Sequence, residues 1–199
     1  MKKGKLIVFY GVNNLGKTTQ AELLEKELIK KEIKILRLKY PLYRLTPSGA
    51  YLNDYLRGGN ILKFSARESQ ILNALDRHQF QEQLIQYLNE GKTVIAEDYF
   101  GTGIAWGIRN GVDKDFLINI NSKLIKPDLA ILFDGKRFVS GKEKGHRHEE
   151  DDELTKKVRQ VHLDLAKEFD WKIINANQSI EDVYKDIFKI VKSFIIILK

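Results

Sequence analysis

Cysteine is absent from the 199-residue chain, and proline is scarce, with three residues. Without thiols the protein has no disulfides and no thiolate metal ligands, which fits a reducing compartment; we expect a cytoplasmic protein. Long apolar runs are also missing, since the continuous apolar run before Gly11 has only five residues and the C-terminal FIIIL is equally short. Neither stretch has the length of a signal-peptide core or a membrane span, so no membrane partner is expected.

Long basic runs are missing too, although the formal net charge is +7 and the isoelectric point is near 9.3. Such a charge favours polyanionic partners, either nucleic acid, a membrane surface or small phosphates. Because no run of Lys and Arg exceeds three residues, a stable nucleic-acid partner is not expected. With 43% hydrophobic and 31% charged residues, positions 1–199 are predicted to form one globular domain.

Short β-type segments alternate with longer segments of helical periodicity. The predicted strands, each separated by at least one helical stretch, are 5–10, 34–40, 93–98, 129–133 and 172–175. A long helix is predicted to begin near Ser65 and to end before Gly91. This order indicates an α/β fold with a five-stranded parallel sheet and helices on both faces.

One polar, glycine-bearing segment, about 135–153, interrupts the pattern with basic residues first and acidic residues last. We interpret it as a mobile loop between helices, either a short lid over an active site or a solvated connection. Its H-R-H-E cluster at 146–149 has metal-ligand residue types, but in a solvated loop we assign no metal to it.

The strongest motif is GVNNLGKT at 11–18, which has the G-x-x-x-x-G-K-[ST] spacing between a predicted strand and a predicted helix. Its glycines let successive backbone N–H groups face phosphate oxygens, Lys17 reaches the β- and γ-phosphates, and the Thr18 hydroxyl binds Mg²⁺. With the strand order, this motif predicts a three-layer P-loop NTPase sandwich that binds phosphate and Mg²⁺, and it leaves open whether the protein is a kinase, a GTPase, a motor or a passive binder. The expected nucleotide contacts from this loop are Gly11, Val12, Asn13, Asn14, Leu15, Gly16, Lys17, Thr18 and Thr19.

Glu97 and Asp98 stand at the carboxyl end of the third predicted strand, where open α/β sheets place their ligands. A carboxylate there can hold Mg²⁺, directly or through water, or act as a base. The alternative is that both acids cap the helix that follows. We assign Glu97 to the metal site together with Thr18.

The chain resembles the thymidylate kinases, a branch of the nucleoside monophosphate kinases, over nearly its whole length. The resemblance rests on GVNNLGKTTQAELLEKEL, KYPLYR, NALDRHQF, EDYFGTGIAWG, PDLAILFD, GKEKGHRHEE and NANQSIEDVYKDI, in that order. It implies a phosphate-binding Arg44, a base-binding Arg77 and an adenine-side loop at Asn177. It also implies transfer of the γ-phosphoryl group from ATP to dTMP under a closing lid.

The same resemblance implies that no strong protein base is needed, because the acceptor is already a phosphate anion. Neither Asn14 nor Leu15 in the P-loop is basic, so any further catalytic cation must come from the lid. The candidates there are Lys142, Lys144 and Arg147. Family members are commonly homodimers, which by analogy implies one here.

Several positions depart from the family pattern. Tyr10 replaces a Glu, Asn13 replaces an acid, Asp98 stands where an Arg is usual, and Asn73 lies near the position of a stacking aromatic. An anion in place of a cation reverses the local field beside a phosphate. Compensation from Arg109, Arg67 or Lys39 is expected, and either Trp106 or Tyr99 is a candidate for stacking on the base, with plain core as the alternative role.

Two other functions fit parts of the pattern. A deoxynucleoside kinase would use a carboxylate such as Glu97 to take a proton from a sugar hydroxyl, although the R-S that commonly follows that acid is missing. A noncatalytic nucleotide-binding or nucleic-acid-binding module would bind ATP without phosphoryl transfer.

Overall fold

The computed structural model describes residues 3–138 and 152–196. The middle of the predicted lid, 139–151, lies outside the described residues. Three of the predicted catalytic cations and the H-R-H-E cluster therefore lie outside them too, namely Lys142, Lys144, Arg147 and 146–149.

Five strands form one parallel sheet in the order β2-β3-β1-β4-β5. The strands are β1 (Leu6–Tyr10), β2 (Ile35–Lys39), β3 (Thr93–Glu97), β4 (Leu129–Asp134) and β5 (Lys172–Asn175). The central strands β1 and β3 are buried along their whole length, as parallel strands covered on both faces must be. All five strands predicted from the sequence are therefore present, with ends that agree to within one residue.

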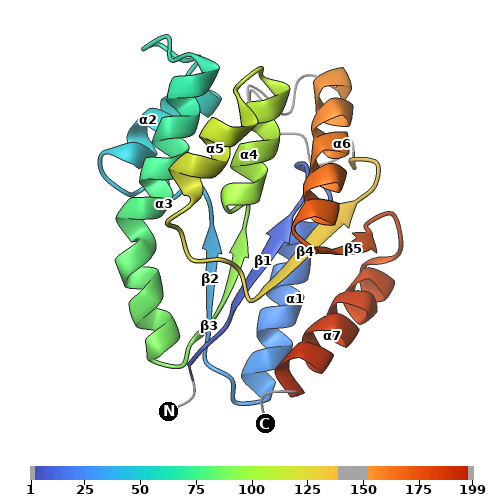
Figure 1. The fold of residues 1–199 in the computed structure, drawn as a ribbon. Coiled ribbons are helices and arrows are strands. Elements are labelled where there is room, and N and C mark those ends of the chain that lie inside the picture. Colours follow the sequence, from blue (N-terminus) through green and yellow to red (C-terminus); the bar gives the residue numbers. More distant parts are fainter. Residues whose placement is uncertain (1–2, 139–151, 197–199) are drawn as a thin grey trace.

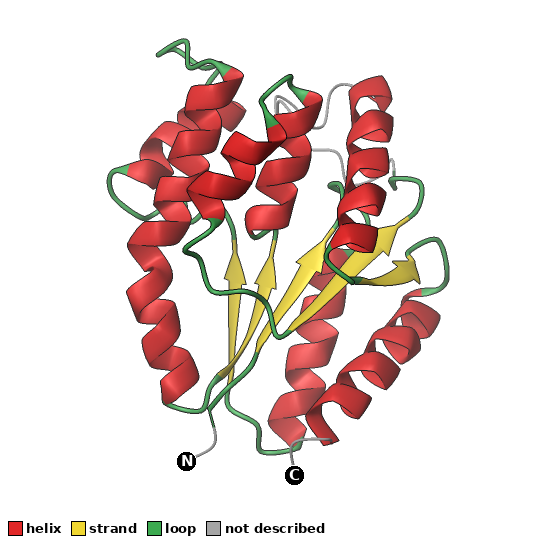
Figure 2. Ribbon diagram, viewed as in Figure 1, coloured by secondary structure: helices red, strands yellow, loops and turns green. Residues whose placement is uncertain are grey.

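Helices cover both faces of this sheet (Figures 1 and 2). One face carries α1 and α7, and the other carries α3, α4, α5 and α6, while α2 packs against α3. Their bounds are α1 (Lys17–Lys30), α2 (Ser48–Arg57), α3 (Ala66–Asn89), α4 (Phe100–Arg109), α5 (Lys114–Asn121), α6 (Asp152–Glu168) and α7 (Ile180–Ile196). The three-layer α/β prediction is confirmed. Within the described ranges, no helix combines the length and apolar character needed to cross a bilayer.

The ends of α3 show why this long helix forms where the sequence predicts it. The Ser65 hydroxyl accepts a hydrogen bond from the Glu68 N–H at 3.2 Å, and the Ser65 N–H donates to the Glu68 carboxylate at 2.7 Å. This reciprocal cap satisfies two N–H groups that the helix cannot bond internally. At the other end Gly91, at φ 79°, provides the left-handed residue that stops the helix.

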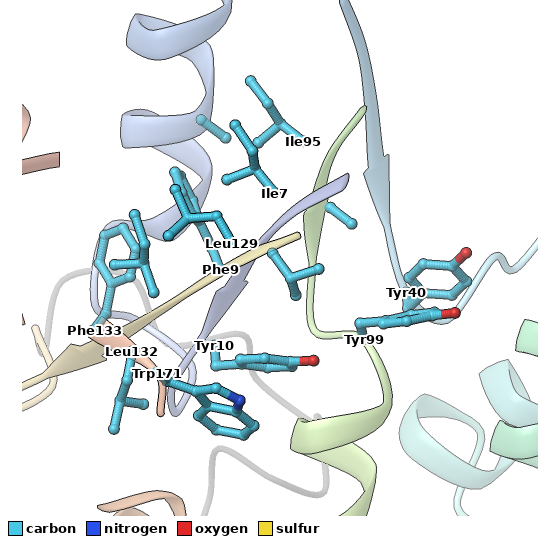
Figure 3. Close-up of a cluster of buried hydrophobic side chains, with 14 of the residues drawn as sticks. Ile7, Phe9, Tyr10, Tyr40, Ile95, Tyr99, Leu129, Leu132, Phe133 and Trp171 are labelled. Atoms are coloured by element: carbon cyan, nitrogen blue, oxygen red, sulfur yellow. The ribbon is translucent and has the colours of Figure 1, made fainter. Parts of the chain in front are cut away.

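Aromatic side chains fill the core near the carboxyl ends of the strands (Figure 3). Tyr10 stacks on Trp171 with ring centroids 4.0 Å apart, and Phe9 packs against Phe133 at 5.0 Å. Tyr10 is fully buried, and burial raises the pKa of its phenol well above the usual value. The residue that replaces an acid before the P-loop is therefore part of the core.

Candidate active site

A cavity of about 440 Å³ opens at the carboxyl edge of the sheet. Its lining combines the P-loop, the end of β3, one face of α3 and the start of α4, which are far apart in the sequence. The P-loop part contains Asn13, Asn14, Gly16, Lys17, Thr18 and Thr19. The part from α3 and α4 contains Gln70, Asn73, Arg77, Thr102, Gly103 and Trp106.

The P-loop connects β1 directly to α1. Gly11 at φ 131° adopts a backbone conformation that other residues avoid, and a Cβ there would lie 2.6 Å from the Phe133 carbonyl oxygen. Gly16 precedes α1 at φ 78° without a side-chain cap, so the first N–H groups of the helix face the loop. Such a helix start attracts phosphate through its N–H groups and its dipole. The Lys17 ammonium lies inside the loop, where it donates to the carbonyls of Gly11 and Val12 at 2.9 Å each.

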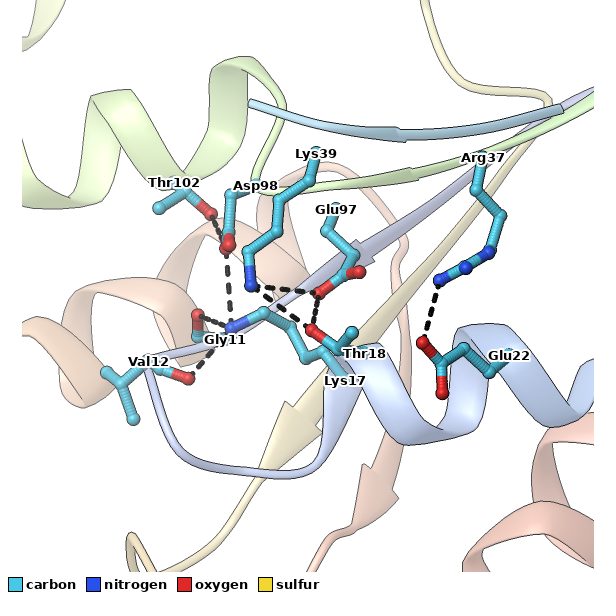
Figure 4. A network of polar contacts seen from close by, with 10 residues as sticks. All are labelled: Gly11, Val12, Lys17, Thr18, Glu22, Arg37, Lys39, Glu97, Asp98 and Thr102. Atoms are coloured by element: carbon cyan, nitrogen blue, oxygen red, sulfur yellow. Dashed lines mark hydrogen bonds and ion pairs between the residues drawn. The ribbon is translucent and has the colours of Figure 1, made fainter. Parts of the chain in front are cut away.

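Thr18 and Glu97 meet at the cavity wall (Figure 4). The Thr18 hydroxyl donates to Glu97 Oε2 at 2.7 Å, and the Lys39 ammonium lies 3.1 Å from the same hydroxyl and 3.8 Å from Glu97 Oε2. Burial, together with repulsion from Asp98, raises the pKa of Glu97, while Lys39 and the Thr18 hydroxyl oppose that rise. A hydroxyl and a carboxylate are hard oxygen donors, and their convergence fits a Mg²⁺ ion that also binds phosphate.

Asp98 follows β3 in a left-handed backbone conformation at φ 58°, which Asp tolerates better than most residues. Its Oδ1 accepts a hydrogen bond from the Thr102 hydroxyl at 3.2 Å and lies 3.4 Å from the Lys17 ammonium. Lys17 is thus the cation beside this anion. Of the three residues expected to compensate the changed field, Lys39 lines the cavity, whereas Arg67 stacks on Phe116 and Arg109 is outside the lining. The helix-capping alternative fails for α4, whose N-cap is Tyr99 without a side-chain cap.

Arg77 of α3 lines the same cavity and is buried. Its side chain is only 3% exposed, and one guanidinium nitrogen donates to Asn121 Oδ1 at 3.3 Å. Burial lowers the pKa of Arg77, and the neighbouring Asp76 opposes that change. Asn73, one turn earlier on α3, donates from its amide to the Ser69 carbonyl at 2.9 Å and lines the same wall.

The two aromatic candidates for base stacking differ in position. Trp106 lines the cavity, whereas Tyr99 is 1% exposed and packs in the core against Tyr40 and Phe100, with centroids 5.1 Å away in both pairs. Burial raises the pKa of Tyr99 to about 12. The structure therefore places Tyr99 in the core, and of these two candidates only Trp106 lines the cavity.

Four other predicted residues do not place their side chains in the cavity lining. Arg44 is exposed outside it, and Arg57 of α2 lines the cavity instead, with its guanidinium 4.5 Å from the Tyr43 ring centroid. Val12 and Leu15 contribute backbone to the P-loop but bury their side chains in the core. The Asn177 amide bonds the backbone of Lys136 in both directions, at 2.6 and 2.8 Å, and so holds the segment after β4.

Sequence reasoning missed Asp76, Gln70 and Arg57. Asp76 is fully buried; it accepts hydrogen bonds from the Leu42 N–H at 3.0 Å and from the Ser48 hydroxyl at 3.1 Å, and thereby fixes the segment after β2. For Gln70 a usable signal exists, because it precedes Asn73 by three residues and Arg77 by seven, which places all three on one helix face. No sequence signal identifies Arg57.

A P-loop that shares one cavity with a wall bearing a buried arginine is typical of P-loop nucleotide kinases. A family model described as Thymidylate kinase matches residues 9–187, and the chain belongs to that family. A thymidylate kinase from Dictyostelium discoideum is 30% identical to this chain, covering 97% of it and 87% of the relative. A "Probable thymidylate kinase" from Pyrococcus horikoshii is 35% identical, covering 96% and 97% respectively.

The solved structure of thymidylate kinase from Candida albicans is similar to this fold with a TM-score of 0.79 at 26% identity. The similarity covers 96% of this chain and 92% of the Candida chain. The fold resemblance expected from the sequence is therefore confirmed over most of the chain.

Proposed function

We propose that this protein is an ATP-dependent dTMP kinase that transfers the γ-phosphoryl group of ATP to dTMP and releases dTDP and ADP. Membership of the thymidylate kinase family supports this activity. The carrying observation is that Lys17 and Thr18 share one cavity with Asn73 and Arg77. The same family membership favours a phosphate acceptor over the deoxynucleoside and noncatalytic alternatives.

In this reaction an oxygen of the acceptor phosphate bonds to the γ-phosphorus while the bond to the β–γ bridging oxygen breaks. Because the acceptor is an anion, the protein's contribution is alignment and charge neutralisation. Lys17 exchanges its bonds to the loop carbonyls for the β- and γ-phosphates, and the loop N–H groups bind the same oxygens. Arg77 holds the acceptor base, and Trp106 packs against that base from α4.

Thr18 and Glu97 would hold a Mg²⁺ ion in this scheme; the ion supplies positive charge to the phosphates when bound. Lys142, Lys144 and Arg147 remain the proposed lid cations. Neutralising all three is expected to reduce kcat far more than ATP affinity, because charge develops during transfer. If the triple variant kept the turnover of the parent, the proposal that these lid cations assist the transfer would be wrong.

We also propose a cytoplasmic homodimer whose partners are small nucleotides, with no stable nucleic-acid partner. Support for the dimer comes from three large apolar residues exposed along α3, namely Ile71 at 46%, Leu75 at 39% and Ile85 at 37%. Apolar stripes of this kind are typical of subunit contacts. Light scattering coupled to size-exclusion chromatography measures the mass directly, and a monomer at micromolar concentration would contradict the proposal.

The test of function supplies Mg·ATP with dTMP, dUMP, dCMP or AMP in parallel with thymidine, and separates the products by ion exchange. Formation of dTDP together with stoichiometric ADP is expected, and Lys17→Ala should abolish it. Conversion of thymidine to dTMP without dTDP formation would instead identify a deoxynucleoside kinase. Binding of ATP without transfer to any acceptor would identify the noncatalytic module.

A further inference from the structure

Gln70 is a buried polar residue that lines the cavity and has no role in the mechanism above. Its side chain is 5% exposed and no protein group in the described part of the chain bonds its amide, which is not fully enclosed and is open to the cavity. Water can hydrate an amide that faces a cavity, and a ligand that displaces this water must supply hydrogen bonds in its place. An unpaired amide at a cavity wall therefore points to a ligand as its partner.

Gly103 of α4 leaves room for Gln70 beside Arg77. A Cβ on Gly103 would lie 3.1 Å from Gln70 Oε1, and 2.7 and 3.0 Å from the two terminal guanidinium nitrogens of Arg77. The amide of Gln70 and the guanidinium of Arg77 are thus neighbours across one glycine. A Cβ on Gly107, one turn later, would lie 3.2 Å from Gln70 Cγ. Glycines at these positions of α4 therefore let the side chains of Gln70 and Arg77 approach the helix closely.

We propose that Gln70 is a specificity-determining residue that reads the edge of the acceptor base together with Arg77, an inference that rests on the proposed function. Arg77 can only donate hydrogen bonds, whereas the Gln70 carbonyl oxygen accepts them. A thymine edge presents a carbonyl oxygen next to a ring N–H, which is one acceptor beside one donor. The pair Arg77 and Gln70 complements that edge.

A cytosine presents an amino group and a bare ring nitrogen at the same positions. The amino group would face the guanidinium, donor against donor, and the amide of Gln70 would have to turn over to donate to the ring nitrogen. Because both protein side chains are buried, a mismatch leaves polar groups unpaired. Gln70 thus contributes to the selection of a pyrimidine with a 4-oxo group. Asn73, in the same wall, stands near the position where family members carry a stacking aromatic residue.

The test replaces Gln70 by Met, which is similar in length and cannot make the amide's hydrogen bonds. We expect KM for dTMP to rise about tenfold, as for the loss of one neutral buried hydrogen bond, with kcat and KM for ATP close to those of the parent. The ratio of kcat/KM for dTMP to that for dCMP should fall by a similar factor. Gln86→Met, the same change at an exposed position of α3, is the matched control and should behave as the parent does.

Calorimetric titration of dTMP into each protein without ATP separates this inference from the proposed function. If the parent binds dTMP but forms no dTDP, the proposed function is wrong, and weaker binding by Gln70→Met still supports base recognition by Gln70. If the parent forms dTDP and Gln70→Met keeps the parent's KM and base ratio, the inference is wrong and the function stands. A variant that loses ATP affinity, dTMP turnover and dCMP turnover equally would assign Gln70 a structural role and also overturn the inference.

Discussion

At the scale of single residues, the charges around the P-loop are arranged differently from the pattern that the resemblance implies. Asp98 stands where an arginine is expected, and Lys17 lies 3.4 Å from its carboxylate. Lys39 places a second ammonium 3.1 Å from the Thr18 hydroxyl, at the pair of residues that fits a divalent cation. An ammonium and a metal ion repel each other at such a distance. Either the Lys39 side chain moves away when a metal ion binds, or its charge weakens metal binding.

Lys39→Met should increase the affinity for a divalent cation. The side chain of Lys39 is 62% exposed, so solvent screens the repulsion and we expect a gain of only about two- to fivefold. Titrating Mn²⁺ into the protein with ADP, and following free Mn²⁺ by electron paramagnetic resonance, measures this without turnover. Lys34→Met, at an exposed lysine just before the same strand, is the control. Equal Mn²⁺ affinity in the parent and the Lys39 variant would contradict the repulsion.

At the scale of secondary-structure elements, α3 forms the wall of the cavity that we propose to bind the acceptor. One face presents Gln70, Asn73 and Arg77 to the cavity, and Asp76 binds the segment between β2 and α2. This proposed acceptor wall therefore belongs largely to a single long helix. The position of this wall relative to the segment after β2 depends on the buried Asp76 carboxylate, which accepts hydrogen bonds from the Leu42 N–H and the Ser48 hydroxyl.

Asp76→Ala should lower the free energy of unfolding by about 2 to 4 kcal/mol, because it leaves the Leu42 N–H and the Ser48 hydroxyl unpaired and removes the anion beside buried Arg77. Urea denaturation followed by circular dichroism measures the change. Ser48→Ala, which removes only one of the two contacts, should cost less. If Asp76→Ala were as stable as the parent, the carboxylate would not be what fixes this segment.

The sequence predicts this level of structure well where the signal is local. The five strands, the start of α3 near Ser65 and its stop at Gly91 all follow from short patterns, and the structure confirms them. Contacts between distant segments are not encoded in any short pattern. Asp76 and Arg57 were missed, and Arg44 was placed at the cavity, because tertiary packing decides that Arg57 lines the cavity and that Asp76 of α3 bonds to Leu42 and Ser48.

At the scale of the whole molecule, stability in acid depends on buried groups that titrate differently after unfolding. His162 of α6 is 1% exposed, its Nδ1 faces the Val158 carbonyl at 3.0 Å, and Nε2 has no partner among the described residues. Burial lowers the pKa of His162 to about 4, a change that nearby Lys17 favours and the Val158 carbonyl and Asp98 oppose. The folded protein therefore keeps this imidazole neutral in mild acid.

The sign of the effect follows from proton uptake. Above about pH 6.5, the ordinary value for histidine, His162 is neutral in both states and contributes no pH dependence. Between that pH and about 4 the unfolded chain binds one more proton, so the free energy of unfolding falls as the pH falls. The full loss amounts to about 3 kcal/mol, at about 1.4 kcal/mol for each unit between the two pKa values. Burial raises the pKa of Asp76, which acts in the opposite direction, so comparing variants is more informative than the parent profile.

His162→Asn tests this account, because the asparagine amide keeps a donor for the Val158 carbonyl but cannot take up a proton in this range. Urea denaturation at pH 8 gives the packing cost of the substitution, since histidine is neutral there in both states. As the pH falls from 6.5 to 4.5, the parent should lose about 2 kcal/mol more than the variant, as two units of proton uptake require. Parallel curves for the two proteins across this window would mean that the imidazole is protonated inside the folded chain. The core would then contain a charged His162 imidazole, although burial disfavours the charged form.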